Sequence, residues 1–312
     1  MAGKVIIAGA TGYIGNALSR HFLEHGQDVF GLLPPGHNDT DCLAPGVRPL
    51  VLVGDGDNSL RIAIANANAD VIVNAAAAGV RRHRHDVNHL VNGNIRFPCQ
   101  LLTAAAAVGT ARFIQLGSWF EYAESAQETA LAETAPLTSF NLYGAAKAGG
   151  TLVLQALARR LDVSLMVLRL FHVYGPDEPP GRLTPYLIER LSLGSKVELR
   201  SCNKARDFVY IGDIAVAVEA AIDALKTSDA TGIYNVCSGR VTTIGTFAKT
   251  AADLMGQPRE LLTFGAVADH EDEMFHAVGA PEAFHRLTGW TASTRLVDGL
   301  AACIAAWQRE HT

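Results

Sequence analysis

The chain has 312 residues, enough for one large α/β domain and a smaller attached one. Hydrophobic residues make up 49% of it and charged residues 18%, which predicts a sizeable core and excludes a largely disordered chain. The net charge of −5 gives no electrostatic footprint for nucleic acid or an anionic membrane, so an anionic partner must be bound locally.

Cysteine usage and the absence of targeting patterns predict a cytoplasmic protein. The five cysteines are odd in number, scattered and never spaced as CxxC, so they indicate neither a disulfide framework nor a zinc site. The start shows no signal-peptide pattern, and the longest apolar runs are too short to span a bilayer. We therefore expect no metal site, no membrane partner and no nucleic-acid partner.

A glycine-rich stretch follows the first predicted strand, at 4–8. Gly9 and Gly12 let the backbone turn and approach a bulky anion, and Gly15 lets the next helix pack closely on the strand. The amphipathic stretch 16–25 predicts that helix, whose N-terminal N–H groups favour a pyrophosphate. A turn that only connects strand to helix is the alternative.

Short apolar runs then alternate with helical patterns. Strands are predicted at 28–33, 47–53, 70–74, 112–116 and 164–170, and helices at 90–108 and 141–161. This alternation predicts an α/β fold with a Rossmann-type doubly wound parallel sheet. Small residues at the exit of one strand, Ala75 and Ala76, leave room for a flat ligand, and Ser118 follows another strand at the same edge.

The chain changes character at the Pro- and Gly-rich cluster 175–181, which is typical of a turn out of the regular layer. We expect 1–174 to form the dinucleotide-binding domain and 175–312 to form mainly a smaller C-terminal α/β substrate-binding domain. Its predicted elements are helices at 184–193 and 213–225 and strands at 196–199 and 233–236, some of them returning to the large sheet. The positive cluster that begins at Arg81 is either a solvated loop or a clamp for a substrate phosphate.

Tyr143 and Lys147 lie four residues apart on a predicted helix, so their side chains share one face. A free tyrosine has a pKa near 10, and a nearby ammonium lowers the pKa by stabilising the phenolate. Such a pair works as an acid/base, and the hydroxyl of Ser118 is placed to hydrogen-bond a substrate oxygen.

Together these motifs resemble the extended short-chain dehydrogenase/reductase family, in its NAD-dependent epimerase/dehydratase group. The resemblance covers nearly the whole chain, in order, and rests on the glycine opening, Gly54-Asp55, the alanines after 74, Asn94, Ser118, Tyr143-Gly-Ala-Ala-Lys147, the stretch 168–176 and the stretch 206–213. It implies a Rossmann domain that holds a nicotinamide cofactor and a C-terminal part that holds a nucleotide-diphosphate sugar.

The resemblance also implies a role for each matching residue. In the family's catalytic triad, Tyr143 exchanges a proton with the sugar oxygen, Lys147 binds the nicotinamide ribose and tunes Tyr143, and Ser118 orients the carbonyl. The implied cofactor contacts are Gly9, Thr11, Gly12, Tyr13, Ile14, Gly15, Gly54, Asp55, Ala75, Ala76, Asn94, Tyr143 and Lys147. The expected substrate contacts are Arg81, Trp119, His172, Arg182 and Arg206.

Some of these assignments have plain structural alternatives. Asp55, which matches the residue that meets the adenine, is otherwise a turn-capping aspartate. Arg206, which matches the sugar-nucleotide phosphate contact, is otherwise a surface ion pair. Trp119 is otherwise a core residue, and His172 is otherwise a structural histidine.

Four departures from the family pattern narrow the function. Leu33 stands where an NAD-binding unit has an acid for the ribose hydroxyl, so we expect a modest preference for NADP(H) over NAD(H). Trp119 and Phe120 replace the Asp-Glu pair of the 4,6-dehydratases, which favours reduction or epimerisation over elimination. His172 replaces an asparagine, and the late diphosphate arginine is missing between 265 and 275, so phosphate binding depends on Arg206 and the cluster at Arg81.

The leading hypothesis is therefore a ketoreductase acting on a nucleotide-activated 4-keto-6-deoxy sugar in deoxysugar biosynthesis. A 4-epimerase with tightly bound NAD is the first alternative, although Leu33 counts against it. A non-catalytic NADP-binding regulatory protein is the second, although an intact Ser118, Tyr143 and Lys147 counts against it. The resemblance also implies a homodimer through the helices predicted at 90–108 and 141–161.

Overall fold

The computed structural model describes residues 3–36, 40–54, 56–79, 86–124, 128–138, 141–227, 230–269 and 274–311. Two residues expected in the site, Asp55 and Arg81, lie outside these ranges.

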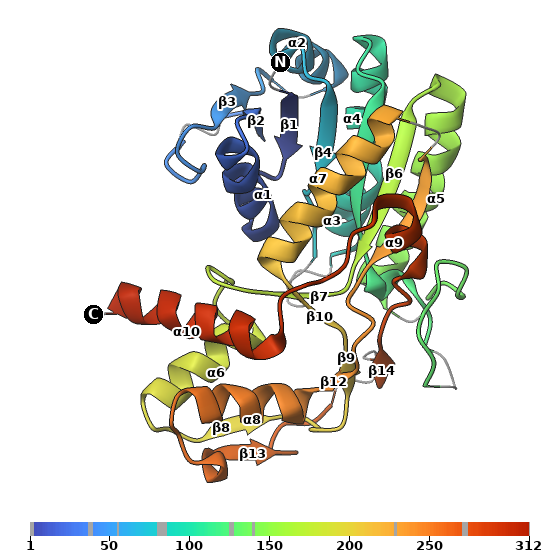
Figure 1. The fold of residues 1–312 in the computed structure, drawn as a ribbon. Helices are drawn as coiled ribbons and strands as arrows, with labels where there is room; N and C mark the ends of the chain where they lie inside the picture. The colour runs from blue at the N-terminus through green and yellow to red at the C-terminus, as the bar shows by residue number, and fades with distance from the viewer. Residues whose placement is uncertain are drawn as a thin grey trace.

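A seven-stranded sheet, parallel throughout, forms the larger lobe (Figure 1), with the strand order β11-β6-β5-β4-β1-β2-β3. This confirms the predicted Rossmann-type doubly wound sheet, whose strand order reverses between β1 and β4. Its strands are β1 (Lys4–Ala8), β2 (Asp28–Leu33), β3 (Arg48–Val51), β4 (Val71–Asn74), β5 (Arg112–Ser118), β6 (Ser164–Leu170) and β11 (Gly232–Val236). β5 runs two residues beyond its predicted end, so Ser118 is the last residue of the strand.

Helices cover both faces of this sheet. α1 (Tyr13–Glu24) and α7 (Ile211–Thr227) pack on one face, and α2 (Asp57–Ala67), α4 (Phe97–Ala107) and α5 (Leu142–Leu161) pack on the other. Alternate residues of each strand serve the two layers: Val5 and Ile7 join the core under α1, whereas Ile6 and Ala8 join the core under α2 and α4. Near-continuous burial of the strands follows from this double cover, except at the edge strand β3, which is mostly exposed.

The helix predicted at 90–108 starts earlier and is interrupted. It consists of α3 (Val87–Val91), a π-helical turn η2 (Asn92–Arg96) and then α4. A Cβ on Gly150 of α5 would overlap the carbonyl of Asn94, so α5 packs directly on the backbone of the π turn. A π turn is typical of functional sites, and here it aims Asn94 at the exit of β4.

The smaller lobe lies below the sheet in Figure 1 and is built from short elements. Its strands are β7 (His172–Tyr174) paired with β10 (Phe208–Tyr210), β9 (Ala205–Arg206) paired with β12 (Thr242–Thr243) and β14 (His276–Ala277), and β8 (Val197–Leu199) paired with β13 (Leu262–Phe264). Its helices are α6 (Leu183–Ser192), α8 (Ile244–Leu254), α10 (Leu296–His311) and the turn η4 (Arg259–Leu261). Two further elements lie with the larger lobe: the turn η3 (Trp119–Glu121), which follows β5, and α9 (Glu282–Thr288).

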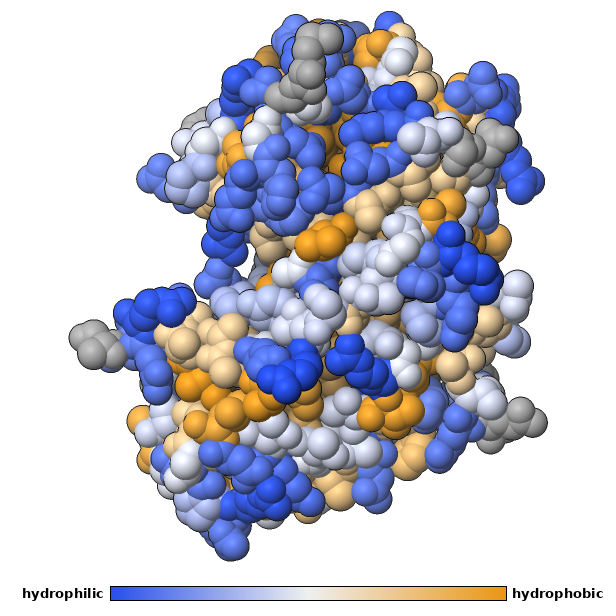
Figure 2. Space-filling model, viewed as in Figure 1, coloured by the Kyte–Doolittle hydropathy of each residue, from blue (hydrophilic) through white to orange (hydrophobic). Residues whose placement is uncertain are grey.

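A separate core holds the smaller lobe together. Leu187 of α6, Phe247 of α8 and Leu300 of α10 are fully buried in it. Figure 2 shows hydrophobic residues gathered on the lower lobe, beneath α10, while the upper lobe is mostly hydrophilic on this face. Between these parts the chain returns to the large sheet, where β11 pairs with β6 and α9 packs against β11. Within the part of the chain that the structure describes, no helix is long and apolar enough to cross a membrane.

Candidate active site

The glycine-rich loop lies at the point where the strand order reverses. Gly9 follows β1 with a φ of +82°, in the left-handed region that glycine adopts without strain. A Cβ at Gly9 would lie 2.7 Å from the backbone nitrogen of Ala76, because the exits of β1 and β4 touch here. Ala75 N also donates a hydrogen bond to the carbonyl of Ala8, at 2.8 Å. Doubly wound sheets bind ligands at this crevice.

The start of α1 fits the pyrophosphate of a dinucleotide. A Cβ on Gly15 would overlap the carbonyl of Gly9, so only glycine lets the helix sit this close to the loop. Gly12 is the N-cap residue, makes no side-chain cap and is followed by no acid in the first turn. The first N–H groups of α1 therefore have no competing carboxylate, and the helix dipole favours an anion there.

The other expected cofactor residues take varied positions. Thr11 is exposed beside the loop, and Ile14 packs against the core. Tyr13 turns its hydroxyl toward Gly175, and this buried oxygen has no hydrogen-bond partner among the described residues. Gly54 is exposed, with a φ of +80°.

Asn94 and Leu33 face the protein in this structure. The Asn94 side chain makes two hydrogen bonds to the backbone of Ala78. Asn94 Nδ2 donates to the Ala78 carbonyl at 3.0 Å, and Asn94 Oδ1 accepts from the Ala78 N–H at 3.2 Å. It therefore braces the loop after β4, where the cofactor is expected. Leu33 is 1% exposed, in the core that α1 covers.

The three expected catalytic residues come together between β5 and α5. Asn141 caps α5 by accepting a hydrogen bond from Gly144 N at 2.9 Å, which places Tyr143 in the first turn. The Ser118 side chain lies near enough to Tyr143 to lower the pKa of its hydroxyl, and the rings of Phe120 and Tyr143 meet edge to face with centroids 5.8 Å apart. Lys147, one turn further along and 5% exposed, donates from Nζ to the carbonyl of Leu116 at 2.6 Å.

Burial controls the titration of this group. It raises the pKa of Tyr143 to about 12; the charge of Glu121 raises this pKa too, while the Ser118 side chain and the charge of Arg182 lower it. The net direction is opposite to the lowering that we expected from Lys147. Burial also lowers the pKa of Lys147, against the opposing effect of Glu121.

Four of the expected substrate residues line the side of the site that faces the smaller lobe. Arg206 is 2% exposed, donates from Nη1 to the carbonyl of Ala205 at 2.8 Å, and lies over the ring of Trp119 with 5.4 Å from Cζ to the centroid. Arg206 is therefore a buried residue, which removes the alternative of a surface ion pair.

His172 and Arg182 complete this side. Burial, with the positive charges of Arg182 and Arg206, holds the pKa of His172 well below its ordinary value, so the imidazole is neutral at pH 7. Arg182 starts α6 and pairs with Glu178 at 3.2 Å, and its charge acts on both His172 and Tyr143. Four separate segments of the chain thus meet around Tyr143.

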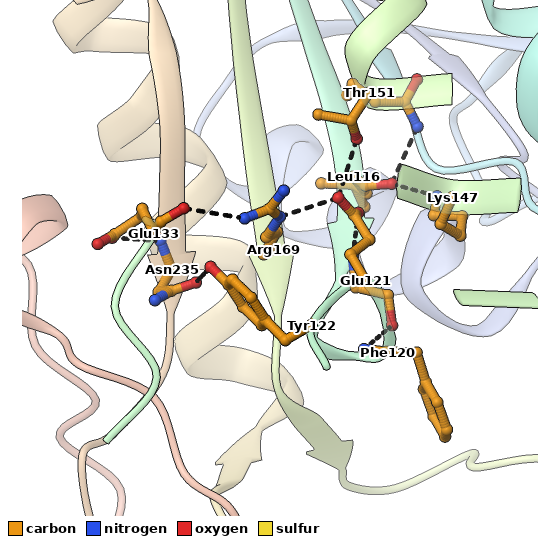
Figure 3. A network of polar contacts seen from close by, with 11 residues as sticks. Leu116, Phe120, Glu121, Tyr122, Glu133, Lys147, Thr151, Arg169 and Asn235 are labelled. Carbon is orange, nitrogen blue, oxygen red and sulfur yellow. Dashed lines mark hydrogen bonds and ion pairs between the residues drawn. The ribbon is translucent and has the colours of Figure 1, made fainter. Parts of the chain in front are cut away.

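Sequence reasoning missed a buried ion pair beneath this site. Glu121 and Arg169 are joined at 2.8 Å, with side chains 0% and 2% exposed (Figure 3). The signal was present as Ser118-x-x-Glu121, a capping-box spacing at the end of a strand, and the structure forms that box around η3.

One group of potential metal ligands exists among the described residues. His21, His25 and Glu219 bring one ligand atom each within 4.8 Å of the others. This group lies at the far end of α1 from the glycine loop, where His21 Nε2 and Glu219 Oε2 are 2.7 Å apart and link α1 to α7.

The fold and the crevice define a dinucleotide-binding α/β protein of the Rossmann class. The profile of the NAD dependent epimerase/dehydratase family matches residues 5–237, and the chain belongs to this family. This confirms the resemblance in the motifs and makes the protein an enzyme that depends on a nicotinamide cofactor.

Known relatives span almost the whole chain at low identity. The Low-salt glycan biosynthesis protein Agl12 of Haloferax volcanii is 27% identical and covers 96% of this chain and 97% of its own. The CDP-abequose synthase of Salmonella muenchen is 24% identical over 95% of both chains. The dTDP-6-deoxy-L-talose 4-dehydrogenase (NAD(P)(+)) of Kitasatospora kifunensis is 25% identical over 83% of this chain and 81% of its own.

A solved structure supports the fold. The UDP-glucose 4-epimerase of Thermus thermophilus, in complex with NAD, superimposes with a TM-score of 0.84 at 22% identity, over 97% of this chain and 98% of that one. At this identity the likeness establishes the architecture, which is the one that the sequence predicted.

Proposed function

We propose that this protein reduces a keto group, at C4, of a nucleotide-activated 6-deoxy sugar with NAD(P)H in deoxysugar biosynthesis. The observation that carries the proposal is that Ser118, Tyr143 and Lys147 come together between the end of β5 and α5, beside a glycine crevice that fits a dinucleotide. The CDP-abequose synthase and 6-deoxy-talose 4-dehydrogenase relatives support the substrate class.

Each catalytic side chain suits a reduction. With a pKa raised to about 12, Tyr143 holds its proton at neutral pH and serves as the donor to the oxygen formed from the carbonyl. Ser118 donates a hydrogen bond to that same oxygen. The nicotinamide supplies the hydride when bound, and Lys147 holds its ribose with the ammonium donors that Leu116 leaves free.

The site also argues against dehydration. Elimination of water needs a free acid and base after the catalytic hydroxyl, and Trp119 and Phe120 occupy those positions. Glu121, the carboxylate whose charge acts on Tyr143, has both oxygens engaged, by Ser118 N on one side and by Thr151 and Arg169 on the other. It has no oxygen to spare for substrate chemistry.

Binding of the diphosphate is proposed for the positive residues next to the smaller lobe. Arg206 and Arg182 supply charge, and the neutral His172 supplies one hydrogen bond. Trp119 is 5% exposed in the core and stacked on Phe120, so its part is to support Arg206. Arg81 stays a candidate for the same diphosphate.

A modest preference for NADPH is part of the proposal. An acid at the end of β2 would repel a 2′-phosphate, and Leu33 carries no charge there. Steady-state rates with NADPH and NADH at matched concentrations test this, and equal turnover with the two would overturn it.

The proposal is tested by assaying NADPH oxidation against a panel of 4-keto-6-deoxy sugar nucleotides that differ in base, followed by NMR of the C4 configuration. Wild-type protein is expected to consume one NADPH for each sugar reduced. Tyr143→Phe should lower kcat by about 100- to 10,000-fold with cofactor binding unchanged, because it removes the proton donor.

Two other outcomes would identify the alternatives. NAD that copurifies and needs no replenishment would indicate a 4-epimerase, a reaction that the same three residues support and that the name of the Thermus enzyme suggests. A Tyr143→Phe variant with full function in the cell, beside a cofactor-site variant with none, would indicate a regulatory dinucleotide sensor.

A homodimer through α4 and α5 completes the proposal. Leu142 and Val153 lie three turns apart on one face of α5, 54% and 46% exposed, and Val87 and Val91 of α3 are exposed nearby. Val153→Glu should convert the dimer to a monomer in light scattering, whereas Val216→Glu, an equally exposed valine on α7, should not. All five cysteines are free thiols, which agrees with the proposed cytoplasmic location.

A further inference from the structure

The buried pair Glu121–Arg169 lies directly under the end of β5. Arg169 is on β6, where its residue pairs in register with Gly117 of β5. Its Nε donates to Glu121 Oε2 at 2.8 Å. Burying two charges costs several kcal/mol of desolvation, so a buried ion pair is weak evidence for a contribution to stability. We therefore expect a role of this pair in the site above it.

One carboxylate oxygen of Glu121 holds the backbone of Ser118. Ser118 N donates to Glu121 Oε1 at 2.9 Å, and Phe120 N donates back to Ser118 Oγ at 3.3 Å. A Cβ on Gly117 would lie 2.7 Å from the same Oε1, so glycine is needed for the carboxylate to reach the strand. The conformation of Ser118 is therefore fixed from both sides.

The other carboxylate oxygen ties this turn to α5. Thr151 donates from Oγ1 to Glu121 Oε2 at 3.0 Å. Tyr143, Lys147 and Thr151 follow one another at four-residue intervals, so they form one stripe along α5. Each contacts the end of β5 or the turn after it: Tyr143 meets the ring of Phe120 edge to face with centroids 5.8 Å apart, Lys147 bonds the Leu116 carbonyl, and Thr151 bonds Glu121.

Arg169 is itself anchored on its other side, toward β11 (Figure 3). Its Nη1 donates to the carbonyl of Glu133 at 3.3 Å, and its guanidinium carbon lies 4.5 Å from the centroid of the Tyr122 ring. The Tyr122 hydroxyl donates to Asn235 Oδ1 at 2.6 Å. The network thus connects α5 to the edge strand of the sheet through Glu121.

We propose that Glu121 is a positioning residue: held by Arg169, its carboxylate fixes the end of β5 against α5 so that the Ser118 hydroxyl faces Tyr143. The assignment rests on the proposed reduction. Its charge also acts on the chemistry, because Glu121 adds to the raised pKa of Tyr143 and opposes the lowering of the Lys147 pKa by burial.

Glu121→Gln tests this, since it keeps the shape and removes the charge. We expect kcat to fall by about 10- to 100-fold through misplacement of Ser118, with KM for NADPH and for the sugar within about twofold. The alkaline limb of the kcat profile should move to lower pH, because the phenolate of Tyr143 no longer faces a negative charge. Unchanged kcat with an unchanged limb, or a rise in KM alone, would overturn the proposal.

A second variant covers the case in which Glu121→Gln fails to fold. Thr151→Val removes one hydrogen bond to the carboxylate and should lower kcat by about fivefold. Thr110→Val is its matched control: Thr110 is also buried and hydrogen-bonded, to the carbonyl of Ala69, but precedes the opposite end of β5. Equal kcat values for the two valine variants would contradict the proposal.

A substrate-free measurement separates this inference from the proposed reaction. In protein labelled with ¹³Cζ-tyrosine, the Tyr143 signal is assigned by its loss in Tyr143→Phe. If wild type reduces no sugar of the panel, the reaction proposal fails, and this signal still decides the role of Glu121. The role of Glu121 is supported if the Tyr143 phenolate appears at lower pH in Glu121→Gln than in wild type, while Thr110→Val titrates like wild type. Identical titrations in wild type and both variants would refute it.

Discussion

The two sides of the crevice are built by different means. The side proposed for the cofactor is made of backbone, with Gly9 and Gly15 letting β1, β4 and α1 approach closely. The side proposed for the substrate is made of side chains, with His172, Arg182 and Arg206 arriving from three separate elements. A backbone surface tolerates no added atoms, whereas a side-chain surface can be retuned one residue at a time.

This difference fits most of the departures from the family's pattern, although Leu33 departs on the cofactor side. The glycine loop is complete, because any substituent would overlap main-chain atoms. The departures at Trp119 and His172 fall on the substrate side, where a new side chain changes the ligand without disturbing the sheet. Changes on the two sides should therefore differ in kind: loss of folding and cofactor on one side, loss of substrate affinity on the other.

Gly15→Ala breaks the backbone-built side and should have the largest effect. Because the new Cβ overlaps the carbonyl of Gly9, we expect a loss of about 3 kcal/mol in the free energy of unfolding and weaker NADPH binding. Urea unfolding and NADPH fluorescence measure the two effects. Gly149→Ala, in the helix α5 and 3.5 Å from Ile95 Cδ1, is the control and should leave both unchanged or improved.

Arg206→Ala breaks the side built from side chains. Loss of a charged hydrogen-bond donor should raise KM for the nucleotide sugar by about 10- to 100-fold, with NADPH affinity and circular dichroism unchanged. Arg190→Ala, which removes a half-buried arginine that bonds the carbonyl of Lys196, should leave KM as it is. A KM that does not move in Arg206→Ala would refute the assigned phosphate contact.

The lowered pKa of His172 should make stability depend on pH, and this is the smallest of the three expected effects. Its native pKa lies well below its ordinary value, so the unfolded chain takes up a proton below about pH 6.5 that the native protein does not. The free energy of unfolding should therefore decrease as the pH is lowered below about 6.5, by up to about 1.4 kcal/mol per pH unit. Urea unfolding at pH 7.5 and 5.5 should show a smaller fall in His172→Asn, and identical falls would contradict the assignment.

Local patterns were enough to predict most of the fold. Strands that are buried on both faces appear as apolar runs, and glycines at fixed spacing mark the loop after β1, so the sheet and α1 were recovered. The π turn η2 was missed, because it depends on Gly150 letting α5 press against Asn94 rather than on any local signal. α7 begins at Ile211, two residues before its predicted start.

The candidate site was predictable in its members and less so in its electrostatics. Helical spacing indicated Tyr143 and Lys147, and family resemblance indicated Ser118, His172 and Arg206. The direction of the Tyr143 pKa was not predictable, because burial, which the spacing does not reveal, outweighs the neighbouring charges. Glu121 had a local signal in its capping-box spacing, but its partner did not.

The sequence by itself determined the layered parallel sheet, the glycine crevice and the helical Tyr143–Lys147 pair. These depend on hydrophobic period, steric freedom and spacing, all of which are local properties of the chain. The tertiary structure alone decided that Glu121 meets Arg169, 48 residues further on. It also decided that the charges of Arg182 and Arg206 act on His172. Such contacts join distant segments and act through desolvation, which exists only once the chain is packed.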